Sequence, residues 1–199
     1  MRMDPATLEL QSARHTTEIS AGELGALVPP GASIGMRDVQ VTPLDPLDQI
    51  ALTWNRGDDP FGAEWGLVIW HPAPGGWRAV YGFTDAARKG VLGIAFRGSD
   101  DVTGDGLPEL LTFEETGGTG WCGTWRVISP NAAGADELLH RPTCDTELRL
   151  TGGTLQRREA VFAPEDPHCC PSSYRTTTFE WDGSAFRKTS SMTETASPA

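Results

Sequence analysis

Hydrophobic and polar residues alternate over short stretches from residue 48 onward, and this pattern predicts β-strands. Ile50–Trp54, Trp65–Trp70 and Trp77–Phe83 are rich in β-branched and aromatic residues, and clusters of Gly, Pro and Asp separate them. Because turn residues interrupt the chain roughly every 8–12 residues, helical spacing does not develop. We therefore expect a single all-β domain over residues 48–190. Its other expected strands are Val91–Phe96, Glu109–Phe113, Thr124–Ile128, Glu137–His140, Glu147–Leu150, Thr154–Phe162, Tyr174–Trp181 and Ala185–Thr189.

The two ends of the chain lack this pattern. Residues 1–47 are expected to form a partly helical or irregular arm, with short helices over Asp4–Leu10 and Ala21–Leu27. Ser20 can cap the second helix, because Glu23 follows three positions later as in a capping box. The polar residues 191–199 are expected to form a disordered tail.

Three segments of the domain repeat a similar order of strands, beginning near Ile50, Pro108 and Arg158. In each segment one strand leads through a long loop to a second, and a tight turn leads to a third. Three- to four-stranded antiparallel meanders of this kind resemble the blades of a β-propeller. The pattern predicts an incomplete propeller or a curved sandwich.

Charge and hydropathy restrict the partners. The chain has 16 Lys and Arg against 27 Asp and Glu, a formal net charge of −11. Nucleic acid is not an expected partner, because binding phosphates requires a basic surface, whereas cations suit this charge. The apolar runs are far shorter than the roughly 20 residues that cross a bilayer, so we expect a chain that does not span a membrane. We expect a monomer.

The segment from Asp101 to Glu109 carries the most specific chemistry in the chain. Oxygen-bearing side chains alternate at Asp101, Thr103 and Asp105, and Glu109 follows at the ninth position. The glycines at 104 and 106 permit tight curvature, and the carbonyl of Leu107 can supply a further oxygen. Calcium prefers 6–8 oxygen ligands in such a flexible arrangement. A structural Ca²⁺ ion bound by these five residues is therefore expected.

This segment also resembles the calcium loops of FG-GAP and VCBS-type repeats, which occur in integrin-like and bacterial extracellular propellers. The resemblance implies the same calcium ligands. The alternative is a metal-free turn, in which Asp101 and Asp105 accept hydrogen bonds from backbone N–H groups.

The four cysteines are Cys122, Cys144, Cys169 and Cys170. An even number is typical of a disulfide framework, and two long-range bridges are favoured because bonding an adjacent pair closes a strained eight-membered ring. Zinc is the alternative, and its possible ligands are His140, Cys144, His168, Cys169 and Cys170. Met1–Pro5 begins no apolar signal segment, so the sequence describes either a cytosolic protein or an exported protein without its export signal. The cysteines favour export, to the cell envelope or beyond.

A second resemblance involves the C-terminal part. The run from His168 to Ser172, followed by a strand ending in Trp181 and the pair Asp182-Gly183, is similar to actinobacterial lipoproteins of the LppP/LprE type. This resemblance covers the last 30 residues or so. It implies an exported protein associated with the cell envelope.

Catalytic motifs are absent from the sequence. The four histidines share no motif, and the adjacent acids Glu114 and Glu115 are expected on opposite faces of a strand, where they cannot act together. The favoured function is a non-enzymatic calcium-binding module that contacts a protein or glycan at the cell envelope. A carbohydrate-active or other hydrolase domain that uses exposed tryptophans is one alternative, and a metal-free structural domain is another. The tryptophans at 54, 65, 70, 77, 121, 125 and 181 are expected mainly in the core.

Overall fold

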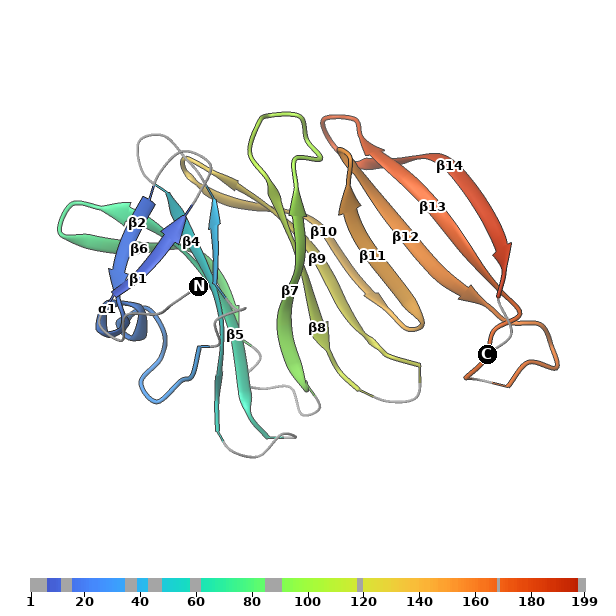
Figure 1. Ribbon diagram of the computed structural model, residues 1–199, viewed down its shortest axis with the longest axis horizontal. Helices are drawn as coiled ribbons and strands as arrows, with labels where there is room; N and C mark the ends of the chain where they lie inside the picture. The colour runs from blue at the N-terminus through green and yellow to red at the C-terminus, as the bar shows by residue number, and fades with distance from the viewer. Residues whose placement is uncertain are drawn as a thin grey trace. The chain divides into compact units, whose positions relative to one another are not determined.

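The computed structural model describes residues 7–11, 16–34, 39–42, 48–57, 62–84, 91–117, 120–167 and 169–196. Within them the chain is all-β apart from one short helix near the N-terminus, and its strands form three four-stranded antiparallel sheets and one hairpin (Figure 1). The predicted fold class is therefore confirmed. None of the helices in the described residues combines the length and apolarity that crossing a bilayer requires.

The three sheets correspond to the three repeated segments of the sequence. The first sheet has the order β3-β4-β5-β6, the second β10-β9-β8-β7 and the third β11-β12-β13-β14. In each sheet the last three strands in sequence are the predicted meander, and one earlier strand completes the sheet. The strands are β3 (Val39–Thr42), β4 (Gln49–Arg56), β5 (Glu64–Ala73), β6 (Gly76–Thr84), β7 (Gly93–Asp100), β8 (Glu109–Glu115), β9 (Gly123–Asn131), β10 (Gly134–Thr143), β11 (Thr146–Thr151), β12 (Thr154–Val161), β13 (Ser173–Trp181) and β14 (Phe186–Thr195).

Two predictions for the ends of the chain are wrong. The expected helix Asp4–Leu10 is replaced from residue 7 by β1 (Thr7–Gln11), which pairs with β2 (Thr16–Ser20); residues 4–6 lie outside the described residues. The expected tail is strand as far as Thr195, because β14 pairs with β13 along most of its length. The second predicted helix is confirmed as α1 (Ala21–Ala26).

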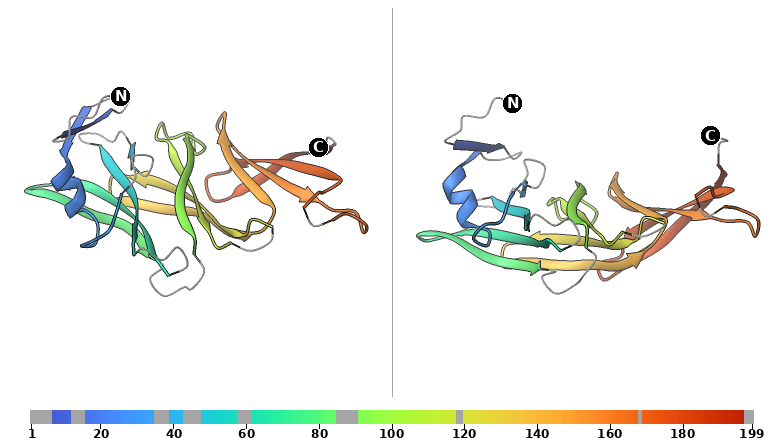
Figure 2. Two further views of the ribbon diagram at one scale, coloured as in Figure 1. Left: turned by 60° about the horizontal axis from the view of Figure 1, so that its bottom comes forward. Right: turned by 90° about the horizontal axis from the view of Figure 1, so that it is seen from below.

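The chain divides into two compact units within the range that the sequence predicts as one domain. Unit 1 contains residues 1–96 and 130–136, and unit 2 contains residues 97–129 and 137–199. In unit 1, α1 lies over one face of the first sheet (Figure 2), and the core there includes Leu27, Ile50, Leu52 and Trp54. Strand β4 is buried on both faces from Gln49 to Trp54, so it lies in the interior of unit 1.

The core of unit 2 joins side chains of β8 and β9 to side chains of β11 and β12. Its fully buried members are Leu111, Phe113, Trp125, Val127, Leu148 and Leu155. The aromatic rings of Phe113 and Trp125 pack at 4.4 Å between centroids. This apolar cluster supports the loops that form the site described next.

Candidate ligand site beside the Cys122–Cys144 disulfide

A disulfide joins two loops of unit 2. Cys122 directly precedes β9, Cys144 lies in the two-residue turn between β10 and β11, and the structure bonds them. Such a bond is consistent with a location outside the cytoplasm, where disulfides persist. The bond also removes Cys144 from the zinc ligands considered above.

The other two cysteines are exposed free thiols, Cys169 and Cys170. The preference for two long-range bridges is therefore wrong, because only one such bridge forms and the remaining pair is adjacent in the sequence. A hydrogen bond with Cys169 raises the pKa of the Cys170 thiol. Within the described part of the chain, no group of three or more His, Cys, Asp or Glu residues is arranged to hold a metal ion; His168, the other proposed zinc ligand, lies outside it.

Trp121 and Asp145 each adopt a left-handed backbone conformation next to a bonded cysteine. Their φ angles are 44° and 49°, and no other non-glycine residue in the described part of the chain has a positive φ. The N–H of Asp145 donates a hydrogen bond of 2.6 Å to the carbonyl of Gly120, so the two loops are also joined through their backbones. Left-handed conformations are strained for bulky side chains and persist only where the surroundings hold them. The disulfide and this hydrogen bond provide that restraint.

Ring contacts hold the indole of Trp121 in place while leaving part of it in solvent. Its centroid lies 4.7 Å from that of Phe113 and 5.9 Å from that of Trp125, and the Arg97 guanidinium lies 5.8 Å from its ring. The side chain is nevertheless 37% exposed, whereas Trp125 is 1% exposed. The expectation of a core position therefore holds for Trp125 and is wrong for Trp121.

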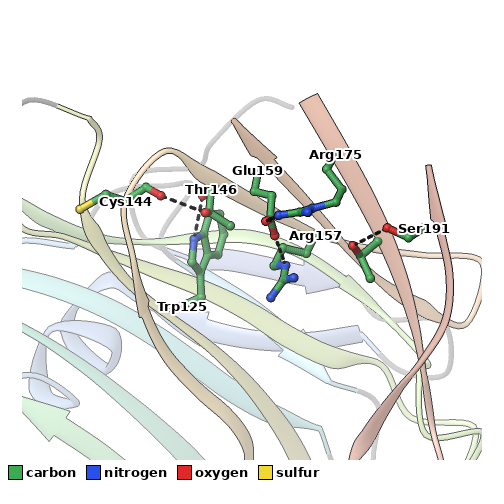
Figure 3. Close-up of polar contacts among 8 residues, drawn as sticks. Trp125, Cys144, Thr146, Arg157, Glu159, Arg175 and Ser191 are labelled. Carbon is green, nitrogen blue, oxygen red and sulfur yellow. Dashed lines mark hydrogen bonds and ion pairs between the residues drawn. The ribbon is translucent and has the colours of Figure 1, made fainter. Parts of the chain in front are cut away.

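A chain of hydrogen bonds supports the loop opposite Trp121 (Figure 3). The indole N–H of Trp125 donates to the carbonyl of Thr146 at 3.1 Å, and the Thr146 hydroxyl donates to the carbonyl of Cys144 at 2.9 Å. Because Trp125 and Thr146 are both buried, the bond between them is protected from water and holds the start of β11 against β9.

Two hollows in the surface of unit 2 share Trp121 and Glu147. The smaller, of about 230 Å³, is also lined by Asp145, Arg158 and Tyr174. The larger, of about 650 Å³, is also lined by side chains of β7, β11 and β12, among them Arg97, Arg149 and Gln156. We call the two hollows together the Trp121 site. Its lining combines an aromatic ring with hydrogen-bond donors and acceptors, as ligand pockets do.

The predicted calcium loop is closed by its own hydrogen bonds. The carboxylate of Asp101 accepts bonds from the N–H groups of Gly104 at 2.7 Å and Gly106 at 2.9 Å. The carboxylate of Asp105 accepts one from the N–H of Leu107 at 2.8 Å. These are the bonds of the metal-free turn that the sequence left as the alternative.

Glu109, the expected ninth-position ligand, is fully buried and accepts four hydrogen bonds. One carboxylate oxygen accepts from the N–H groups of Val102 and Thr103, at 2.8 and 3.1 Å. The other accepts from the hydroxyls of Thr103 and Ser129, at 3.1 and 2.9 Å. Burial raises the pKa of Glu109, and the four hydrogen bonds oppose that rise.

This arrangement of Glu109 does not fit calcium. A carboxylate has about four lone-pair positions, and the four donors use all of them, so Glu109 has none left for an ion. The Thr103 hydroxyl, another expected ligand, donates to Glu109. Calcium binding by the loop stays a prediction, and it would require these bonds to be exchanged.

The same loop region supports the Trp121 site. The carboxylate of Asp100 accepts a 3.0 Å hydrogen bond from the N–H of Gly153, in the turn between β11 and β12. Thr151, at the end of β11, lines the larger hollow. The turn that borders the hollow is thus bonded to the residue that precedes the Asp101–Glu109 loop.

One of the acids considered for hydrolysis, Glu114, lies in the interior of unit 2. Glu114 is buried and pairs with the buried Arg126 at 2.8 Å, so its carboxylate is not available to a substrate in this structure. The acids that line the Trp121 site are Asp145, which follows Cys144, and Glu147, the second residue of β11. Neither acid belongs to a motif that predicts a site from the sequence, where the available signal is the position of Trp121 and Asp145 next to cysteines.

Unit 1 has a hollow of another character. It has a volume of about 420 Å³ and lies beside α1, with Leu27, Trp54, Trp70 and Phe83 in its lining. No ionisable side chain is among its described lining residues. The Trp121 site, with both aromatic and charged groups, offers more specific recognition.

Comparison with known proteins adds no assignment: the chain matches no protein-family model, no curated protein and no solved structure. Both family resemblances therefore stay predictions.

Proposed function

We propose that this chain is a non-enzymatic binding module that works outside the cytoplasm, in the secreted fraction or at the cell envelope, and that its ligand binds at the Trp121 site. One observation carries the proposal. Trp121 and Asp145, held in left-handed conformations, flank the two bonded cysteines and line one hollow. The bulky side chain of Trp121 is strained in this conformation, and strained residues that line a cavity are more often found where a ligand binds than elsewhere.

The rigidity of the site supports binding. The disulfide, the hydrogen bond between Asp145 and Gly120 and the ring contacts of Trp121 all restrict the same two loops. A site that is ordered before binding loses little conformational entropy when the ligand arrives. A role as a metal-free structural domain does not require an aromatic ring to be held partly exposed beside a hollow.

Ligand-observed NMR with a library of water-soluble fragments tests this function. We expect fragments that show saturation transfer from the wild-type protein and lose it in the Trp121→Ala variant. Trp181→Phe is the matched control, because Trp181 packs against Phe186 in the same unit and lines neither hollow of the site. Fragments that bind Trp121→Ala as well as they bind the wild type would refute the proposed site, as would a library without any binder.

A further inference from the structure

The chemistry of the Trp121 site indicates the class of its ligand. Three arginines line the two hollows, Arg97, Arg149 and Arg158, against the carboxylates of Asp145 and Glu147. The Arg158 guanidinium also bonds to the Glu194 carboxylate at 3.2 Å. Positive and negative charges therefore balance, and the site favours a ligand without net charge.

The hydrogen-bonding groups of the site are of both kinds. Arg97 and Arg149 can only donate, Glu147 can only accept when ionised, and the Gln156 amide can do both. One oxygen of the Glu147 carboxylate accepts from Arg149 at 2.9 Å, so its other oxygen is the acceptor for a ligand hydroxyl. A ligand with many hydroxyl groups matches this mixture, because each hydroxyl donates one hydrogen bond and accepts others.

The aromatic ring adds a preference for a ring-shaped ligand. The π-face of an indole is electron-rich and attracts weakly polarised C–H groups. A pyranose ring has C–H groups on one face and hydroxyls around its edge, so it can stack on Trp121 while its hydroxyls reach the polar side chains. The larger hollow lies within the range of about 300–1,000 Å³ that is typical of ligand sites.

We propose that the Trp121 site binds an uncharged oligosaccharide, with one sugar ring stacked on the exposed indole of Trp121 and its hydroxyls hydrogen-bonded to Glu147 and Gln156. This inference rests on the proposed function and gives that function a ligand class. Because Trp121 and Glu147 border both hollows, a ligand of two or more linked rings can extend from one hollow into the other.

Fluorine NMR of the full chain labelled with 5-fluorotryptophan provides the test. The chain has seven tryptophans, and the Trp121→Phe variant identifies the resonance of Trp121 by its absence. The probes are cellotetraose, chitotetraose, mannotetraose and arabinotetraose, with the open-chain polyol sorbitol as a control that has hydroxyls but no ring. We expect at least one tetrasaccharide to shift the Trp121 resonance, and sorbitol to shift none.

The variants distinguish the loss of stacking on Trp121 from a loss of folding. Measured by isothermal titration calorimetry, Trp121→Ala is expected to weaken the binding of that saccharide at least tenfold, which equals about 1.4 kcal/mol. Trp121→Phe, which keeps a smaller ring, and Glu147→Gln, which keeps the side-chain shape, are each expected to weaken it less. Trp181→Phe is expected to bind like the wild type. Far-UV circular dichroism spectra and cooperative thermal transitions like those of the wild type show that each variant is folded.

The outcomes distinguish the two proposals. If fragments bind at Trp121 and no tetrasaccharide shifts its resonance, the saccharide inference is wrong and the binding function stands. If neither fragments nor saccharides bind there, both are wrong. Equal saccharide affinity in the wild type and in a folded Trp121→Ala variant would also overturn the inference.

Discussion

Trp121 shows how a single residue differs from the expectation set by its type. Tryptophans bury large apolar areas, and burial statistics place most of them in cores, as for Trp125. Whether a given indole stays exposed depends on the backbone angles and on the loops around it. Both depend on contacts between residues far apart in the sequence, such as that between Gly120 and Asp145, and hydrophobic patterning along the chain does not report them.

Gly120 provides a direct test of this local geometry. Its φ is 103°, and a Cβ at this position would lie 2.8 Å from a carboxylate oxygen of Asp145. We expect Gly120→Ala to reduce the free energy of unfolding by roughly 2–3 kcal/mol, from backbone strain and from this contact. The measurement is urea denaturation followed by tryptophan fluorescence.

Gly152→Ala is the matched control for Gly120→Ala. Gly152 also has a positive φ, of 58°, but a Cβ there would meet nothing within 4 Å. We expect it to cost about 1 kcal/mol, from the left-handed conformation alone. Equal losses in the two variants would mean that the loops beside the disulfide are not packed as described.

Glu109 gives stability a pH dependence of known sign. Its pKa in the folded state is raised above the ordinary value of 4.5, so the unfolded chain releases this proton first as the pH rises. Between pH 4.5 and the raised pKa, the free energy of unfolding is therefore expected to fall as the pH increases, and above that pKa the loss is complete. Glu109→Gln is expected to remove this contribution, and also to cost about 1–3 kcal/mol because an amide cannot accept from all four donors.

Ser129→Ala serves as the comparison for Glu109→Gln. It removes a hydrogen bond that lowers the pKa of Glu109 while leaving the carboxyl in place, so the fall in stability should extend to higher pH. Denaturation curves measured across pH 4 to 8 would show both effects. A Ser129→Ala profile that instead ends at lower pH would contradict this description of Glu109.

Among the elements, the strands that alternate clearly were predictable and the others were not. The central strands of each sheet read as strands because burial on one or both faces imposes an apolar pattern, as in β9, where Thr124 to Pro130 are all buried. The short strand β3 was missed because four residues are too few to show a period. Thr7–Gln11 shows the alternation Thr-Leu-Glu-Leu-Gln, which is typical of a strand. The helix prediction gave this alternation too little weight, and the segment pairs with β2 as a strand.

A buried ion pair also joins strands β8 and β9, and breaking it is predicted to lower the free energy of unfolding substantially. Arg126→Met removes the partner that holds the Glu114 carboxylate at 2.8 Å and leaves that charge buried, so we expect a loss of about 3–5 kcal/mol of stability. Arg126 also lies 3.2 Å from the Glu137 carboxylate. The double variant Glu114→Met with Arg126→Met should therefore recover the part of this loss that comes from the buried Glu114 charge, because that charge is gone. Thermal denaturation of both variants is the measurement, and a double variant that is less stable than Arg126→Met would contradict the prediction.

The Asp101–Glu109 loop is the element for which sequence and structure lead to different expectations. Its oxygen-rich spacing predicts calcium, whereas its hydrogen bonds use the lone pairs of Glu109. From the structure we expect the melting temperature to be the same in excess calcium and in excess chelator. A melting temperature that rises with calcium concentration, as binding to the folded state requires, and does not rise in Asp101→Asn would show instead that the loop binds the ion.

For the whole molecule, composition predicted the class of protein better than its chemistry. The acidic net charge and the even number of cysteines pointed to a disulfide-bonded protein that does not bind nucleic acid, and the Cys122–Cys144 bond agrees with the first part. The pairing itself could not be predicted, because four cysteines permit three connectivities. The division into two compact units could not be predicted from the sequence either, since the second sheet contributes residues to both units.

The central claim is that the ligand of this protein binds against Trp121, between the loops that the disulfide joins. A crystal structure of the oxidised protein soaked with the tightest-binding fragment or saccharide tests it most directly. We predict ligand density in contact with the Trp121 indole and within hydrogen-bonding distance of Glu147. Ligand density confined to another surface, with the Trp121 site filled only by solvent, would contradict the account.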